Sequence, residues 1–126
     1  MNPEQNSLLT DLESHNWGTM MPVMLMIGAE VVSLRARGNC AIKPADLALF
    51  EAQVGDVDDF RGRLRSVFVQ KINDVLGEAS QGKTSLDEMK KDWAALESNL
   101  KSRVGEALEP LGLAVQQLKI EAIEAV

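Results

Sequence analysis

Two long helical patterns fill most of the second half of the chain and constrain its fold more than any other feature. In the first pattern, apolar residues recur three or four positions apart and stop before Gly77; they are Phe60, Leu64, Val67, Phe68, Ile72, Val75 and Leu76. This spacing predicts an amphipathic helix of about five turns. The second pattern keeps the same spacing through Leu86, Met89, Trp93, Leu96, Leu100, Val104 and Leu108. Two apolar stripes of this length need a further layer of structure to cover them.

Helix signals separate and end these patterns. Ser85 and Glu88 have the spacing of a capping box, which predicts that the second helix begins there. Pro110 ends it, because proline cannot continue the hydrogen-bond ladder. A final strand is predicted next from Leu113, Val115, Leu118 and Ile120. The change of phase at Gln116–Gln117 indicates a bulge in that strand.

The first half of the chain contains a strict alternation. Val32, Leu34 and Ala36 alternate with Ser33, Arg35 and Arg37. This period of two predicts a strand with one face toward water. Gly38–Asn39 follows, so a tight hairpin or a glycine bulge is expected before a strand at residues 40–42. With another strand at residues 22–27, the region predicts a three-stranded antiparallel meander.

The remaining segments complete an α+β architecture. Leu47, Phe50 and Val54 predict a short helix that ends at Gly55. Residues 1–16 are polar apart from a small leucine cluster, so we expect a flexible, frayed leader with at most one helical turn. Residues 17–126 then form a single domain. In it, a small antiparallel or mixed sheet packs against two to three helices, and the C-terminal strand returns to the sheet.

Charge and cysteine content exclude several classes of protein. The chain has 126 residues and a net charge of −6, which repels phosphate backbones and argues against nucleic acid as a partner. Cys40 is the only cysteine and cannot form an internal disulfide. We therefore expect a cytoplasmic protein.

The apolar run from Met20 to Ile27 does not have the features of a membrane anchor. A spanning helix needs about 20 apolar residues, and a signal peptide has a basic leader that residues 1–19 lack. Any membrane contact is expected to be peripheral, at the inner face. Four methionines lie in this run: Met20, Met21, Met24 and Met26. Core filling is their expected role, and an exposed, adaptable surface is the alternative.

No set of residues in the sequence predicts catalysis. Cys40 and His15 are the only conceivable nucleophile and base, but no pattern brings His15 to the strand, and Cys40 is expected to be a small buried residue. One cysteine and one histidine cannot build a zinc site. We predict no catalytic residue, no metal site, no cofactor and no small-molecule substrate.

Two groups of residues are candidates for contacts with other molecules. The basic group could bind lipid head groups or a partner, or form an ordinary solvated face with ion pairs; it comprises Arg35, Arg37, Arg61, Arg63 and Arg65. The apolar group lies on the last helix and could serve self-association or internal packing; it comprises Trp93, Leu96, Leu100 and Val104.

With these elements placed, the chain resembles the SPFH (band 7) domain of stomatins, prohibitins and flotillins, in a shortened form of the bacterial, virion-core-like branch. The resemblance covers roughly residues 17–122. Its pieces in the first half of the chain are residues 17–19, 32–38, 42–43 and 54–56, with Asp46 and Phe50. In the helical half they are residues 64–67, 84–88, 111–115 and 118–120. Their order and spacing carry the resemblance together.

The resemblance implies a non-catalytic scaffold that self-associates at or near a membrane. A homo-oligomer is therefore the expected state. Family members usually carry a membrane anchor before the domain and a coiled coil after it, and we expect neither in this chain. The alternative is a soluble adaptor that binds one protein partner in an apolar groove between the two long helices.

Overall fold

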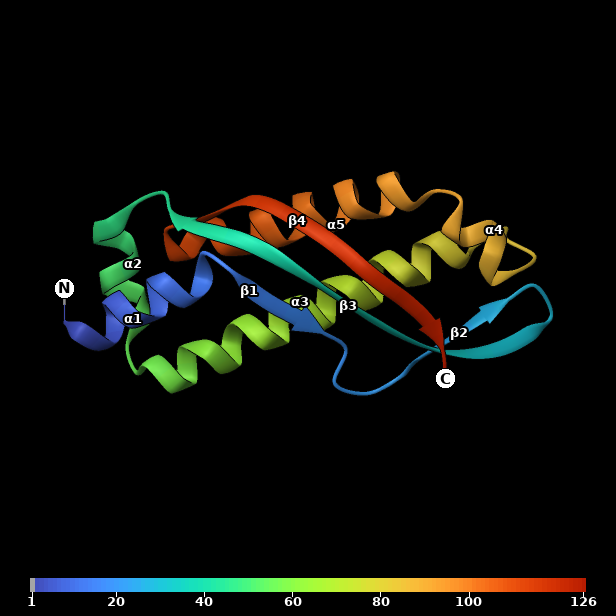
Figure 1. Cartoon of the computed structure of the whole chain (residues 1–126), viewed down its shortest axis with the longest axis horizontal. Coiled ribbons are helices and arrows are strands. Elements are labelled where there is room, and N and C mark those ends of the chain that lie inside the picture. Colours follow the sequence, from blue (N-terminus) through green and yellow to red (C-terminus); the bar gives the residue numbers. More distant parts are fainter. Residues whose placement is uncertain (1) are drawn as a thin grey trace.

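The computed structural model describes residues 2–126 and has an α+β fold, as predicted (Figure 1). Its elements in chain order are α1 (Pro3–Leu12), β1 (His15–Gly18), β2 (Val23–Ile27), β3 (Glu30–Pro44), α2 (Leu47–Val54), α3 (Val57–Ser80), α4 (Leu86–Lys90), α5 (Trp93–Leu108), the 3-10 turn η1 (Glu109–Leu111) and β4 (Leu113–Ala125). The four strands form one antiparallel sheet, and β4 returns to it from the C-terminal end of the chain.

Strand β3 is the centre of the sheet. It pairs with β4 over residues 34–44, and both β1 and β2 pair with its other edge. Gly18 lies opposite Arg37, and Val23 lies opposite Leu34. Strands β1 and β2 therefore behave as one strand that is interrupted by residues 19–22. Thr19 spans the interruption, because its backbone N–H donates to the carbonyl of Ala36 at 3.0 Å.

The expected meander is wrong, because β3 runs without a break through Gly38 and Asn39. A bulge does lie at Gly38, the position where the alternative to a hairpin placed a glycine bulge, but its extra residue belongs to the partner strand β4. The pairing of β3 with β4 shifts by one residue between Arg37 and Gly38, where Glu121 is the extra residue of β4. A second shift leaves Gln116 unpaired, which confirms the bulge predicted there. Strand β1 was missed, because four residues are too few to show a period of two.

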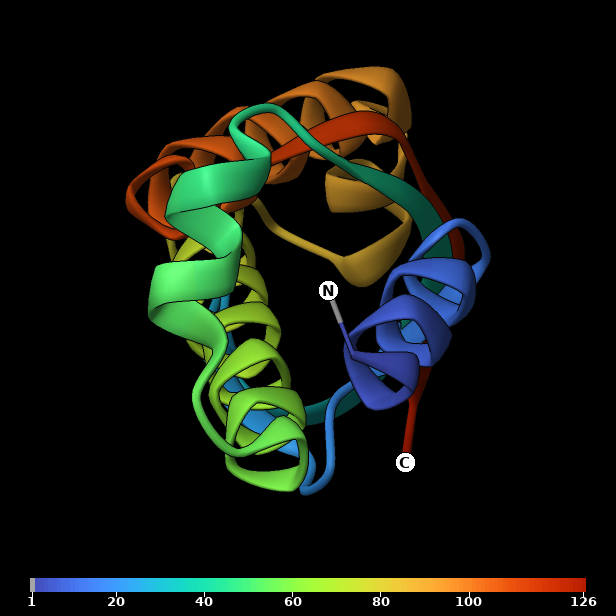
Figure 2. The ribbon, with the colours of Figure 1, turned by 90° about the vertical axis from the view of Figure 1, so that its left-hand side faces the viewer.

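The helices cover one face of the sheet and enclose the core. The alternating residues Leu34, Ala36, Cys40 and Ile42 are buried on that face. Phe50 of α2 meets Phe60 of α3 edge-on, with ring centroids 5.7 Å apart. Seen end-on, α2 and α3 lie across the molecule from α1 and from strands β3 and β4 (Figure 2). Helix α2 has the bounds that the sequence predicts, and Gly55 follows it with φ of 55°.

The N-terminal segment differs from the expected frayed leader. Asn2 and Gln5 form a capping box that starts α1. Leu8 and Leu12 lie one turn apart on the helix and are both fully buried. Burial of these two side chains stabilises a helix that its own propensity would not hold. Met1, the first residue of the expected leader, lies outside the described residues.

The long helices also differ in extent from the prediction. Helix α3 continues past Gly77 to Ser80. The second pattern is split into α4 and α5 at Lys91 and Asp92. Ser85 caps α4 by accepting from the N–H of Glu88 at 3.2 Å, whereas the Glu88 carboxylate accepts from Thr84 rather than from Ser85. These two hydrogen bonds from Thr84 hold the pKa of Glu88 below its usual value.

Candidate interaction surfaces

Two of the five candidate arginines lie on the face of the sheet that the helices leave open. Arg35 and Arg37 are two residues apart on β3, so both side chains project from this face. Arg37 forms an ion pair with Glu121 at 3.1 Å, and Arg35 lies opposite Glu124 in the strand register. Both of these arginines therefore have carboxylates beside them.

A second pair, Arg61 and Arg65, lies one turn apart on α3. Both line a hollow of about 370 Å³ beside β1. Arg61 binds Asp11 of α1 at 2.7 Å, whereas Arg65 makes no ion pair with any residue in the range 2–126. Arg65 is thus the arginine of this pair with an unneutralised charge.

The structure does not gather all five arginines into one patch. Gly18 and Thr19 line the hollow with Arg61 and Arg65, and they also line a hollow of about 310 Å³ with Arg35 and Arg37. These four arginines therefore flank the end of β1 from two sides. Arg63 is separate from them: its guanidinium lies 5.8 Å from the centre of the Phe60 ring and donates to the carbonyl of Gln53.

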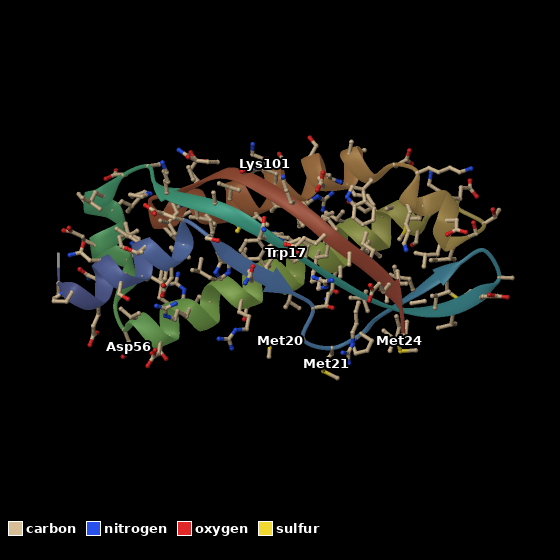
Figure 3. All side chains as sticks on the ribbon, in the orientation of Figure 1. Trp17, Met20, Met21, Met24, Asp56 and Lys101 are labelled. Carbon is tan, nitrogen blue, oxygen red and sulfur yellow. The ribbon has the colours of Figure 1, made fainter. Side chains whose placement is uncertain are left out.

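The methionine cluster is on the surface, so the expectation that it fills the core is wrong. The exposed fractions are 66% for Met20, 77% for Met21, 69% for Met24 and 59% for Met26. Met20 and Met21 lie in the interruption between β1 and β2, where no strand partner covers them. Figure 3 shows Met20, Met21 and Met24 at the rim of the molecule. The exposed, adaptable surface is the alternative that the structure supports.

The apolar stripe of α5 faces inward. Leu96, Leu100 and Val104 are buried in the core. Trp93 is partly buried, and its indole N–H donates to the carbonyl of Ile120 at 3.2 Å. These residues pack against the core of the chain, and of the four only Trp93 keeps part of its side chain at the surface.

Residues of α5 also cover part of the outer edge of β4, which the sequence analysis did not detect. Strand β4 pairs with β3 alone among the strands of residues 2–126. At Ile120 the outward carbonyl accepts from Trp93, and the outward N–H donates to Glu97 at 2.8 Å. Trp93 and Glu97 are four residues apart and therefore share a helix face. That spacing was visible in the sequence, but nothing indicated that a strand edge lay beside it.

The structure does bring Cys40 and His15 together, contrary to expectation. They lie opposite each other in the pairing of β1 with β3. Burial raises the pKa of the Cys40 thiol to about 12, so the thiol stays protonated at neutral pH. Burial, and then the charges of Arg61 and Arg65, lower the pKa of His15. A protonated, buried thiol is a poor nucleophile, and this arrangement suits packing.

Across residues 2–126 no three side chains of His, Cys, Asp or Glu come together in a way that could hold a metal ion. Over the same residues, no helix is both long enough and apolar enough to cross a bilayer.

Comparison with known families decides the classification. The family model described as "SPFH domain-Band 7 family" matches residues 6–125. The chain belongs to the SPFH (band 7) family. This SPFH match spans nearly the whole chain, from within α1 to the last residue of β4, and it confirms the resemblance found in the sequence. Membership supports a membrane-associated domain of the scaffold type, in a family that is generally non-catalytic. A search of curated proteins gave no match.

Proposed function

We propose that this SPFH domain is a non-catalytic scaffold that acts at or near a membrane by self-association. The observation that carries the proposal is the outer edge of β4. This strand is 13 residues long, and among the strands of residues 2–126 it has a neighbour on one side only. An unpaired edge presents N–H and C=O groups to which another strand can bond.

The position of the free groups follows from the pairing. The N–H of Val126 donates to the carbonyl of Ser33, so Val126 points its backbone groups toward β3. Backbone direction alternates along an antiparallel strand, which turns the groups of Ala125 and Ile123 outward. The side chains of Trp93 and Glu97 form hydrogen bonds with the outward backbone groups of Ile120 and of no other residue in β4. The last third of β4 is thus the part of the edge that can accept a second copy.

The apolar stripe of α5 does not support self-association, because Leu96, Leu100 and Val104 are buried within the protomer. The edge of the sheet is therefore the surface on which we base self-association. A second copy that pairs along β4 would gain main-chain hydrogen bonds without rearrangement of the core.

Substitution of Ala125 tests the proposal. Ala125→Pro removes one outward N–H from an exposed position, and Ala125→Ser is the matched control that keeps it. In sedimentation equilibrium we expect the native chain and Ala125→Ser to associate with rising concentration, and Ala125→Pro to associate at least several-fold more weakly. A native chain that stays monomeric at high concentration would refute the proposal.

We also propose that the arginines beside β1 provide the membrane contact. Each Lys or Arg near an anionic surface contributes about 1 kcal/mol. The fourfold variant Arg35→Gln, Arg37→Gln, Arg61→Gln and Arg65→Gln should lose co-sedimentation with vesicles that contain phosphatidylserine. Arg63→Gln is the control, because Arg63 lies apart from the other four. Equal binding by both variants would exclude this surface.

The alternative of an adaptor with a groove between the two long helices has less support. Helices α3 and α5 bury their stripes in one common core. A hollow of about 1070 Å³ lies elsewhere, between α3 and residues 20–25.

A further inference from the structure

Two hollows adjoin along α3, and together they have the form of a binding site. The larger has a volume of about 1070 Å³; residues 20–25 form one wall, and α3 forms the other from Gly62 to Asn73. The smaller is the hollow beside β1 that contains Arg61 and Arg65. Met20 and Arg65 line both, so the two hollows are direct neighbours. Their combined size is in the range of small-molecule sites or above it.

The two hollows differ in chemistry. The larger is lined by Met20, Met21 and Met24, whose labelled side chains lie at the lower rim in Figure 3. Exposed thioether side chains are apolar and adapt their shape to what they contact. The polar residues of the opposite wall, such as Gln70 and Asn73, are exposed at the rim of the groove.

The end near β1 is positive. Among the described residues, the charged ones that line the two hollows are Arg61 and Arg65, and none of the lining residues is Asp or Glu. This is unusual in a chain with 19 acidic and 13 basic residues. Asp11 neutralises Arg61 in part, whereas Arg65 makes no ion pair within residues 2–126. The groove is apolar along its length and ends at the guanidinium of Arg65, which has no ion pair within residues 2–126. Such a groove favours a molecule with an apolar tail and an anionic head.

We propose that this site binds a single-chain anionic amphiphile of the fatty-acid class. The carboxylate lies at Arg65, where a guanidinium can donate two parallel hydrogen bonds. The alkyl chain lies along the methionine wall. From Arg65 to Asn73 the groove follows α3 for about 12 Å, at 1.5 Å per residue. The hollow is concave and can hold one free molecule, without a bilayer present. This inference does not depend on self-association.

Isothermal titration calorimetry with dodecanoate, below its micelle concentration and without vesicles, tests the site. We expect saturable binding of one molecule per chain. Dodecyltrimethylammonium has the same tail with the opposite charge, and butyrate has the same head with a short tail. Dodecyltrimethylammonium should bind at least tenfold more weakly, which is the fold-change that one charge-assisted hydrogen bond provides. Butyrate should also bind at least tenfold more weakly, because it lacks most of the methylene groups that the apolar wall would bury. Equal binding of dodecyltrimethylammonium would show nonspecific detergent uptake and overturn the proposal.

Paired variants locate the site. Arg65→Gln should weaken dodecanoate binding roughly tenfold. Lys101→Gln should leave it unchanged, because Lys101 projects from α5 on the far side of the molecule (Figure 3). Met24→Gln should weaken binding. Met26→Gln is the matched control and should leave binding unchanged, because Met26 also lies in β2 but is not among the residues that line the groove. No binding to the native chain, or equal losses in Met24→Gln and Met26→Gln, would overturn the proposal. Sedimentation of the same samples reports self-association separately.

Discussion

At the scale of single residues, Gly38 shows how closely the sheet is packed. A Cβ atom at this position would lie 1.9 Å from the carbonyl oxygen of Lys119 and 2.6 Å from the ring of Trp17. Trp17 in turn stacks on Phe68 of α3, with ring centroids 6.0 Å apart. Because residue 38 has no side chain, the backbone of β4 at Lys119 and the ring of Trp17 can both approach it closely.

Substitution of Gly38 is expected to be strongly destabilising. Overpacking of a core costs about 1–3 kcal/mol, and the contact with rigid backbone places Gly38→Ala at or above the upper end of that range. Gly77→Ala is the matched control, because nothing lies within 4 Å of its added Cβ and it is inside α3. That variant should gain about 0.5–1 kcal/mol. Urea unfolding measures both, and a neutral Gly38→Ala would contradict the packing described.

Cys40 gives a prediction about pH. Its pKa is raised from 9.0 to about 12 in the folded state, so the unfolded chain loses this proton at a lower pH than the folded chain does. The contribution of the thiol to stability is therefore complete below pH 9 and is lost between about pH 9 and pH 12.

We expect the free energy of unfolding to fall across that interval more steeply for the native chain than for Cys40→Ala, which has no thiol to titrate. Denaturant unfolding at several pH values gives the two slopes. Equal slopes would mean that the folded thiol ionises near its ordinary pKa. The same burial should protect Cys40 from iodoacetamide until the chain unfolds.

At the scale of elements, α5 does more than cover the sheet. Its stripe fills the core, and its Trp93 and Glu97 satisfy the outward groups of Ile120. A helix that supplies both a donor and an acceptor to a strand edge replaces a missing neighbouring strand at that residue.

Trp93→Phe tests this arrangement, because it keeps an aromatic ring and removes only the N–H donor. We expect a loss of about 1 kcal/mol, the net value of one hydrogen bond. Trp93→Ala should cost clearly more, since it also removes the packing of the ring on the core. Thermal unfolding of the two variants separates the contributions. Equal melting of Trp93→Phe and Trp93→Ala would show that the ring contributes nothing to the core.

Elements with strong periodicity were predictable from sequence, and those defined by tertiary contacts were not. The spacing of Leu47, Phe50 and Val54 gave α2 its observed bounds. The phase change at Gln116 gave the bulge in β4. Strand β1 has no comparable signal, because its only buried side chain is Trp17 and its partner residues in β3 lie 19 to 25 residues away. Helix α1 depends on Leu8 and Leu12, which are buried by residues distant in sequence.

The candidate sites were less predictable than the fold. An arginine in the sequence gives its charge but not its neighbours, so the partners Asp11 and Glu121 could not be inferred. The methionine run alternates as a core strand does, yet Met24 and Met26 are exposed while Ile27 is buried. Their exposure follows from the position of β2 at the edge of the sheet, which the sequence does not reveal.

At the scale of the whole molecule, the surface has distinct regions. The open face of the sheet carries charged residues, the groove along α3 is apolar with a basic end, and β4 ends in an unpaired edge. For an SPFH domain of the scaffold type, separate regions would let one copy bind another copy through the edge while its other surfaces remain free. The central claim is therefore that the outer edge of β4 joins copies of the chain.

Amide hydrogen exchange tests that claim most directly. The N–H groups of Ile123 and Ala125 point away from β3, so they should exchange rapidly in dilute protein. Edge pairing would bury them in a new ladder. Measured by NMR across a concentration series, their protection should rise together with the mass of the particle, while the already bonded N–H of Ile120 changes little. If the mass rises and the exchange of Ile123 and Ala125 does not slow, the copies associate through another surface and the claim is contradicted.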